Sequence, residues 1–250
     1  MPIPNRVTLG GYVYHVLNRA NGRLRIFKKQ GDFLAFEQIL AEGIERFAMR
    51  ICGYCIMSNH WHLLLWPEHD GELSNFMRWI TLTHTQRYHA AHGRTGIGHL
   101  YQGRHKSFPV QNDSYYLTVM RYVESNPIRA EIVAEAEDWP WSSFTVRQGT
   151  ESLFSLSDDP IKLPNDWGRL VHDHIDQEEL NNLNNSIKRA APLGESTWAR
   201  KTAIAMNIES TMNPRGRPKK KGRIPLICPT FNSPWRKFRC DCPVFSLDLP

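Results

Sequence analysis

Hydrophobic and polar residues follow one another along the chain in patterns that predict short strands and longer helices. Period-two runs rich in β-branched and aromatic residues predict strands, and apolar residues at helical spacing predict helices. The predicted elements, in chain order, are a strand at 12–17, a helix at 33–47, two strands within 50–66 joined near Ser58-Asn59, a helix at 73–88, a strand at 107–110, and a helix from Asp113 or Ser114 to near Pro127. This order, β-α-β-β-α-β-α, is the ferredoxin-like arrangement with one extra helix. The expected fold is α+β, an antiparallel sheet with helices on one face.

The same patterns assign side chains to the core. In the helix at 73–88 we expect Phe76, Ile80 and Leu82 to make core contacts. Cys52 and Cys55 lie in a predicted core strand, where residues three apart face opposite sides, and we expect both to be buried thiols.

Beyond Trp139-Pro140-Trp141 the pattern changes. Residues 151–165 are rich in Ser, Asp and Pro and are typical of a linker, while 166–191 and 196–210 have helical patterns. We therefore expect a domain at 1–150, a small helical domain at 151–212, and a flexible tail at 213–250 with little periodicity.

The net charge of +6 is concentrated in that tail. Residues 213–223 contain six Lys or Arg and no acid, whereas residues 1–212 hold 22 Lys and Arg against 23 Asp and Glu. A dense basic stretch on a near-neutral body is typical of nucleic-acid binding, although a solvated tail has the same composition.

Other compositional features exclude some classes. The chain has no apolar run of about 18 residues and no apolar segment behind a charged N-terminus, so we expect neither a membrane span nor a secretion signal. Five unevenly placed cysteines do not suggest a disulfide framework. We expect a cytoplasmic protein.

His60 and His62 form the first candidate site. Alternate residues of a strand face the same side, so both imidazoles share one face and can share a metal, while Trp61 faces the core. Two half-buried strand histidines are the alternative interpretation. His172 and His174 have the same spacing in a helical pattern, where such residues do not face each other, and we expect them to be surface histidines.

Tyr122 and Asn126 form the second candidate site. They are four residues apart and so would lie on one helix face, with Pro127 marking a probable helix boundary. An amide oxygen beside two imidazoles suits Mg²⁺ or Mn²⁺ better than a thiolate site would. Ordinary packing of a tyrosine on a helix is the alternative.

Several separated motifs together carry a resemblance to a known family. They are YHVLNRANGR at 14–23, CIMSNHWHLLLWP at 55–67, LYQGRHKS at 100–107, MRYVESNPIRAEIV at 120–133 and WPWSSF at 139–144. The chain resembles the REP-associated tyrosine transposases, relatives of the single-tyrosine HUH transposases of bacterial insertion elements. One departure is Ser58, where the family often has Pro before Asn-His.

The resemblance implies an HUH nuclease fold with His60 and His62 as metal ligands, Asn126 as the polar third ligand and Tyr122 as the nucleophile. The implied activity is metal-dependent cleavage and rejoining of single-stranded DNA at hairpin-bearing repeats through a 5′-phosphotyrosine. Monomer and homodimer both remain open.

Two groups of residues are candidate DNA contacts. Arg104, Lys106 and Arg121 are candidate contacts to backbone phosphates, and an ordinary surface charge is the alternative for each. The tail segment looks like an AT-hook, whose two arginines can follow the narrow minor groove of an A·T-rich duplex. Its residues are Arg215, Gly216, Arg217, Pro218, Lys219, Lys220 and Lys221.

Three alternatives compete with this interpretation. A DNA-binding regulator on a vestigial HUH nuclease fold would keep the tail and the fold but need no metal. A metal hydrolase with a water nucleophile would leave Tyr122 without a role. A zinc tail formed by Cys228, Cys240 and Cys242 would lack paired CxxC units and a clear fourth ligand.

Overall fold

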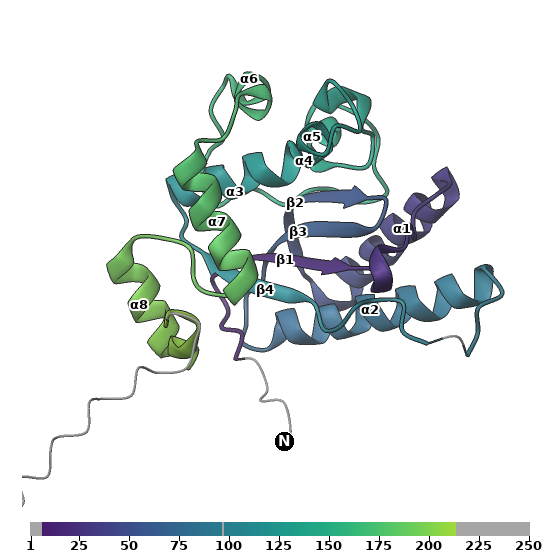
Figure 1. Ribbon diagram of the computed structural model, residues 1–250, viewed down its shortest axis with the longest axis horizontal. Coiled ribbons are helices and arrows are strands. Elements are labelled where there is room, and N and C mark those ends of the chain that lie inside the picture. Colours follow the sequence, from purple (N-terminus) through teal and green to yellow (C-terminus); the bar gives the residue numbers. More distant parts are fainter. Residues whose placement is uncertain (1–6, 97, 214–250) are drawn as a thin grey trace, which may run out of the picture. The chain divides into compact units, whose positions relative to one another are not determined.

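The computed structural model describes residues 7–96 and 98–213, and its elements follow the predicted β-α-β-β-α-β-α order (Figure 1). In chain order they are β1 (Val13–Arg19), α1 (Gln30–Phe47), β2 (Arg50–Met57), β3 (His60–Trp66), α2 (Glu72–Ala91), β4 (Lys106–Val110) and α3 (Ser114–Glu124). The later helices are α4 (Asn126–Arg129), α5 (Ser143–Arg147), α6 (Trp167–His172), α7 (Gln177–Arg189) and α8 (Ser196–Ala205). Short 3₁₀ turns are η1 (Asn21–Arg23), η2 (Ala136–Asp138) and η3 (Glu209–Thr211).

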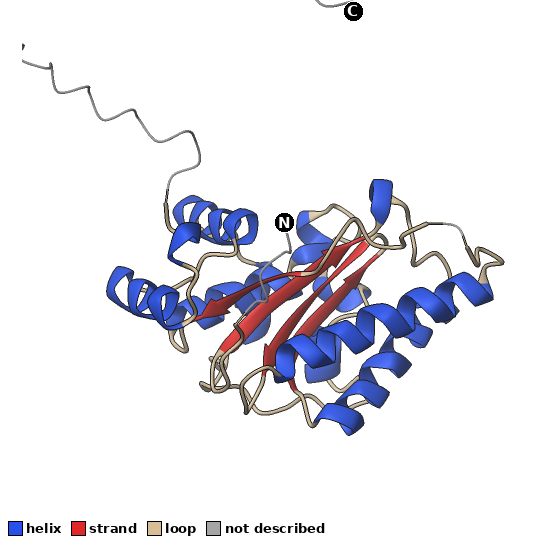
Figure 2. Cartoon of the chain, turned by 90° about the horizontal axis from the view of Figure 1, so that it is seen from below, coloured by secondary structure: helices blue, strands red, loops and turns tan. Residues whose placement is uncertain are grey.

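The four strands form an antiparallel sheet in the order β2-β3-β1-β4. Helices α1 and α2 lie along one face of the sheet (Figure 2). The strand residues on that face, among them Trp61 and Leu63, pack against these two helices. Those on the other face, among them Val13 and Leu64, pack against α3. The fold is thus α+β, as predicted.

Helices cover both faces of this sheet, which corrects the expectation of helices on one face only. The physical reason lies in the strands. Both alternating sets of side chains are apolar, so exposing either face of the sheet to water would be unfavourable, and each face is covered by helices. α1 and α2 approach closely at Gly43, where a Cβ would lie 2.8 Å from Ile80 Cδ1 and 2.9 Å from a ring carbon of Phe76.

Leu82 differs from expectation in its exposure, and Cys52 and Cys55 differ in the face of the sheet that they share. Leu82 is 55% exposed, because the buried stripe of α2 runs through Phe76, Ile80 and His84, and Leu82 lies two residues off that stripe. Cys52 and Cys55 are both buried, as expected, but they share one face of the sheet. The register of β2 against β3 shifts between Ile51 and Gly53, and such a bulge reverses the alternation.

The segment after residue 150 packs onto the sheet and α3. Ser157 donates its backbone N–H to the Ile51 carbonyl at 2.9 Å, and Phe154 is buried in the core with its ring centroid 5.4 Å from that of Tyr54 on β2. The pattern at 166–191 is divided into α6 and α7. Contacts gather the described residues into one compact unit, so the division at residue 150 stays a prediction, and the basic tail lies outside the described residues.

A buried ionic network holds this later segment against α3. The Glu124 carboxylate, fully buried, accepts hydrogen bonds from Ser143 Oγ at 2.6 Å and Trp167 Nε1 at 2.7 Å. Arg147 pairs with Glu124 at 3.1 Å and with Asp159 at 2.8 Å. Because every charge in this group has a partner, the network can remain buried.

Candidate active site

His60 and His62 lie on the face of β3 that is turned toward α3, with ring centroids 5.0 Å apart. Trp61 between them is fully buried on the opposite face, where its indole N–H donates to the Tyr101 hydroxyl at 2.9 Å. The alternation expected for a strand therefore brings the two imidazoles together.

Hydrogen bonds fix how each of these rings presents its nitrogens. Nδ1 of His60 lies 2.6 Å from the Asn59 side-chain oxygen, which can only accept, so the lone pair of His60 is on Nε2. Nδ1 of His62 lies 2.9 Å from Nε2 of His15. This contact likewise leaves Nε2 of His62 outside the pair, as in metal sites whose ligand histidines are held through the other ring nitrogen.

Burial keeps both imidazoles neutral near pH 7. It lowers the pKa of His60 to about 4, with a smaller effect from the Arg19 charge. It holds the pKa of His62 well below its ordinary value, helped by the neighbouring His60. A neutral imidazole has the lone pair that a metal ion requires.

His15 is a third histidine of the site, and the sequence pattern did not single it out. It lies on β1, fully buried, and its ring stacks on that of His62 at 5.1 Å and 10°. Its Nδ1 is buried without a hydrogen-bond partner among the described residues. Strand alternation alone could not find it, because only the pairing of Leu17 with His62 shows that the two faces coincide.

Tyr122 faces these histidines from α3. Its ring centroid lies 5.7 Å from that of His62 and 6.2 Å from that of His15, in edge-on contacts. The Arg129 guanidinium carbon lies 4.2 Å from the centroid of the same ring, a cation–π contact that the sequence analysis did not anticipate.

The two other tyrosines of α3 have different surroundings. Tyr116 is fully buried and donates its hydroxyl to Asp159, and burial, with the Cys52 and Asp159 charges, raises its pKa. Tyr115 lines a separate cavity beside the acidic N-terminus of α7. Of the three, Tyr122 alone has a ring contact with His15 or His62.

Asn126 begins α4 and does not continue α3. Ser125 separates the two helices, and Pro127 has no backbone N–H to continue the hydrogen-bond ladder of α3, whereas a proline is tolerated in the first turn of α4. The Asn126 side-chain amide still turns back to the Tyr122 carbonyl, at 3.4 Å. Its oxygen accepts no hydrogen bond from a described residue.

The donor atoms of these residues are of the types that suit the expected divalent ion. They are the Nε2 atoms of two neutral imidazoles, each ring oriented through Nδ1, and an amide oxygen that accepts no hydrogen bond from a described residue. Nitrogen and oxygen donors without a thiolate suit Mg²⁺ or Mn²⁺.

A chain of basic residues leads away from the histidines. Arg19 and Arg23 line a cavity of about 340 Å³ with Asn59 and His60. Arg19 also lines a second cavity of about 340 Å³ with Arg104 and Lys106. Two of the predicted DNA contacts thus lie beside the site.

Arg121 has a different environment. Its guanidinium donates to the Leu170 carbonyl at 2.9 Å and to the carbonyls of Asp173 and His174 at 3.3 and 3.2 Å. These donors complete the C-terminal end of α6, so they are engaged within the protein. The AT-hook-like residues 215–221 lie outside the described residues.

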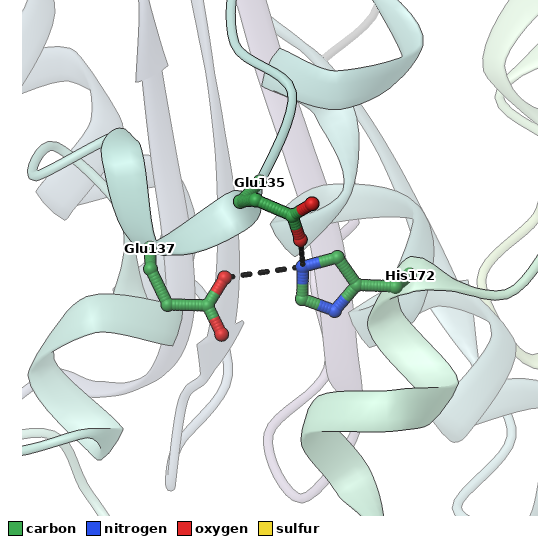
Figure 3. A group of neighbouring side chains, drawn as sticks. All are labelled: Glu135, Glu137 and His172. Carbon is green, nitrogen blue, oxygen red and sulfur yellow. Dashed lines mark ion pairs between the residues drawn. The ribbon is translucent and has the colours of Figure 1, made fainter.

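His172 contacts two carboxylates, where a surface histidine without such partners was expected. Its Nε2 lies 3.0 Å from a Glu135 oxygen and 3.1 Å from a Glu137 oxygen (Figure 3). Its Nδ1 donates to the Gly168 carbonyl at 2.8 Å. In the part of the chain that the structure describes, these three form the one group of His, Cys, Asp or Glu donors close enough to share an ion. α6 ends at His172, so His174 is outside the helix.

No helix among the described residues is long and apolar enough to cross a membrane.

A family model described as IS200-like transposase matches residues 8–126, which include all four candidate site residues. A curated relative, the REP-associated tyrosine transposase of Escherichia coli (strain K12), is 26% identical over 137 residues, which is 54% of this chain and 77% of the relative. The solved structure of a REP-associated tyrosine transposase bound to a REP hairpin aligns with a TM-score of 0.48 at 20% identity, covering 71% of this chain and 99% of that one. Over residues 8–126, just under half of its length, the chain is thus similar to the IS200-like transposases, and the curated relative that it matches is a tyrosine transposase.

Proposed function

We propose that this protein is a tyrosine transposase that cleaves and rejoins single-stranded DNA at hairpin-bearing repeats, with Tyr122 as the nucleophile and a divalent metal held by His60, His62 and Asn126. The observation that carries the proposal is the edge-on contact of the Tyr122 ring with the His62 ring at 5.7 Å. A phenol in this position lies beside the two neutral imidazoles, which is where a nucleophile must be to reach a phosphate held at them.

In the proposed reaction the Tyr122 oxygen attacks the phosphorus of a DNA phosphodiester. The bond from phosphorus to the 3′ oxygen breaks, which leaves a free 3′-OH and a 5′-phosphotyrosine. A 3′-OH then attacks the phosphotyrosine, reforms a phosphodiester and releases the phenol. The phosphodiester energy is conserved in the covalent bond, so the reaction needs no nucleoside triphosphate.

The residues of the chain have distinct tasks in this scheme. Arg129, over the Tyr122 ring, favours the negative charge that develops as the phenol loses its proton. Arg19 and Arg23, in the cavity of His60, are placed to hold the non-bridging phosphate oxygens. When bound, the metal ion polarises the phosphate and offsets charge in the transition state.

The DNA partners belong to the same proposal. Arg19, Arg104 and Lys106 share a cavity next to the site and would contact the backbone of the hairpin strand. The relative from Escherichia coli is named for its association with REP sequences, which supports repeats of that kind as substrates. Residues 215–221 would bind A·T-rich duplex DNA. Arg121 is left out of the interface, because its donors are engaged at the end of α6.

Covalent trapping tests the proposal directly. Hairpin oligonucleotides with a labelled single-stranded flank are incubated with the protein and Mn²⁺ or Mg²⁺, and labelled protein is sought on a denaturing gel. We expect a covalent adduct that disappears with Tyr122→Phe and with a chelator. Tyr115→Phe is the matched control, since Tyr115 is on the same helix away from the histidines, and it should still form the adduct.

Other outcomes would favour the alternatives. Hairpin binding without an adduct, over many hairpins and both metals, would favour a DNA-binding regulator on a vestigial nuclease fold. Cleavage that continues with Tyr122→Phe would favour a hydrolase with a water nucleophile.

A further inference from the structure

An aromatic cavity of about 530 Å³ lies next to the proposed catalytic site, and the mechanism above does not use it. Its walls include Phe33 from α1, and Trp139 and Trp141 from the segment between η2 and α5. Both tryptophans are only partly buried. Partly exposed aromatic rings that line a cavity are a common feature of ligand-binding sites.

The rings of this cavity are held in place. Phe33 stacks on Trp141 at 4.7 Å and 16°, and meets Trp139 edge-on at 5.8 Å. The Trp139 indole N–H donates to the Ile56 carbonyl at 3.1 Å, and the Trp141 carbonyl accepts from the Ile56 amide at 2.9 Å. These bonds to β2 fix the rings before any ligand arrives, so little conformational entropy is lost on binding.

Two cations stand at the same cavity. Arg25 and Lys28 are exposed, line the cavity, and form no ion pair with a described residue. The nearby Asp32 carboxylate is already engaged: it accepts the amide N–H groups of Lys28 and Lys29 and lies 3.2 Å from His92. The positive charge of Arg25 and Lys28 is therefore available to an anionic ligand.

The cavity adjoins the surroundings of His60, because the two cavities share a lining residue. Ser58, in the turn between β2 and β3, lines both this cavity and the one that contains Arg19, Arg23 and His60. The Ser58 carbonyl accepts the amides of Ile26 and Phe27 at 2.9 and 3.0 Å, which holds the loop of Arg25 and Lys28 against that turn. A strand bound at His60 can therefore continue into the aromatic cavity.

We propose that this cavity binds an unpaired base of the DNA strand close to the phosphate that Tyr122 attacks, an inference that rests on the proposed function. The base stacks on the fixed aromatic rings, and Arg25 and Lys28 contact the adjoining phosphate. Flat π-faced groups joined by phosphates are what a site of aromatics and cations recognises in single strands. Bases within a duplex are stacked on one another and present no free face, so the cavity selects single-stranded DNA.

Binding without chemistry provides the test. All proteins carry Tyr122→Phe, and the affinity for a hairpin with a single-stranded flank is measured by fluorescence anisotropy in the presence of a chelator. Trp141→Leu and the double change Arg25→Ala/Lys28→Ala should each weaken binding of the flanked hairpin roughly five- to a hundredfold. Binding of the same hairpin without its flank should not change.

Matched controls separate the cavity from general effects. Lys29→Ala removes a neighbouring exposed cation outside the cavity, and Trp66→Leu removes a partly buried tryptophan at the other end of β3. Both should leave the affinity for the flanked hairpin within about twofold. In addition, an oligonucleotide with 5-iodouracil at each flank position in turn should photo-crosslink to Trp139 or Trp141 from one or two adjacent positions only.

The outcomes distinguish this proposal from the proposed function. If the cavity variants bind the flanked hairpin as tightly as the parent, or lose duplex affinity equally, the base-binding cavity is refuted while adduct formation through Tyr122 still stands. If the variants lose flank binding and the otherwise unmodified protein forms no adduct, the cavity stands and the nuclease proposal fails. If the protein binds no single-stranded flank at all, both are wrong.

Discussion

His15 is a single buried side chain that orients one member of the proposed metal-binding pair, His60 and His62. Nδ1 of His62 can keep its proton only if Nε2 of His15, 2.9 Å away, accepts the hydrogen bond. Burial also lowers the pKa of His15 to about 3, so it is a neutral acceptor at every pH of interest. His15 is therefore a positioning residue for His62, and it would not touch the DNA.

Replacing His15 should weaken metal binding without removing a ligand. We expect His15→Phe to lower the affinity for Mn²⁺ roughly 10- to 100-fold, as loss of a partner behind a ligand usually does. Electron paramagnetic resonance of free Mn²⁺, titrated with protein carrying Tyr122→Phe, measures this affinity. His15→Gln retains an acceptor and should recover part of the loss. Equal affinity in His15→Phe and the parent would show that His62 needs no support from His15.

Tyr122 illustrates selection among similar residues. The sequence spacing alone cannot distinguish it from Tyr115 or Tyr116, because all three lie on one predicted helix. Packing distinguishes them: the Tyr116 hydroxyl is buried against Asp159, and Tyr115 faces another cavity. The residue that meets His62 is also the one covered by the Arg129 guanidinium.

Among the elements, α3 has the largest share in forming the site. Its N-terminus is capped by Asp113, whose side chain accepts the Tyr115 amide at 2.9 Å. Its C-terminal Glu124 is held in the network with Arg147, and Ser125 then turns the chain into α4. Because both ends of α3 are fixed, Tyr122 keeps its position against the sheet.

The end of α6 carries a pH-dependent contact. Burial alone would lower the pKa of His172, but its bond to Gly168 and the Glu137 and Glu135 carboxylates outweigh this and raise it. The folded protein therefore binds this proton more tightly than the unfolded chain. The resulting stability is fully present below the unfolded pKa of about 6.5 and is lost as the pH rises through the higher folded value.

Urea unfolding at pH 6 and pH 8 measures this contribution. The free energy of unfolding of His172→Gln should fall less between the two pH values than that of the parent. The difference should be below about 1 kcal/mol, because the Glu135 and Glu137 carboxylates are largely solvent-exposed and their ion pairs with His172 are screened. The double change Glu135→Gln/Glu137→Gln should reproduce the smaller fall. A parent and His172→Gln with the same pH dependence would exclude this role for His172.

At the scale of the whole molecule, the sheet lies between the larger part of the apolar core and the candidate site. α1 and α2 on one face supply most of the apolar core, and α3 on the other face completes the candidate site. The basic residues near the site and the aromatic cavity adjoin the same turn between β2 and β3. One compact unit thus combines stability with a proposed path for a DNA strand.

The tail contributes the remaining prediction. Removing residues 213–250 should weaken binding to an A·T-rich duplex and flatten its salt dependence by about 0.9 in slope for each lost phosphate contact. Arg215→Ala/Arg217→Ala should mainly abolish the preference for A·T over G·C. Changing Lys219, Lys220 and Lys221 to Ala should weaken both duplexes equally. Fluorescence anisotropy at several salt concentrations measures these effects. Unchanged duplex binding after truncation would disprove the AT-hook role of residues 215–221.

The order of elements and part of the site could be predicted from the sequence. Strands and helices follow from apolar periodicity within a few residues, and the shared face of His60 and His62 follows from strand alternation. The cap at Asp113 is similarly local. The choice of Tyr122 as nucleophile also required the family resemblance, because periodicity does not distinguish three tyrosines on one helix.

Other features were decided only by tertiary structure. His15 joins the site because β1 pairs with β3, and Trp139 meets Phe33 across more than a hundred residues of chain. The bulge in β2 that turns Cys52 to the same face of the sheet as Cys55 depends on the register of two strands. The sequence predicts a DNA contact at Arg121, but in the folded chain its guanidinium donates to a carbonyl of α6. Short-range periodicity encodes which way a side chain points within its element, whereas its neighbours depend on how distant elements pack, and no local pattern carries that information.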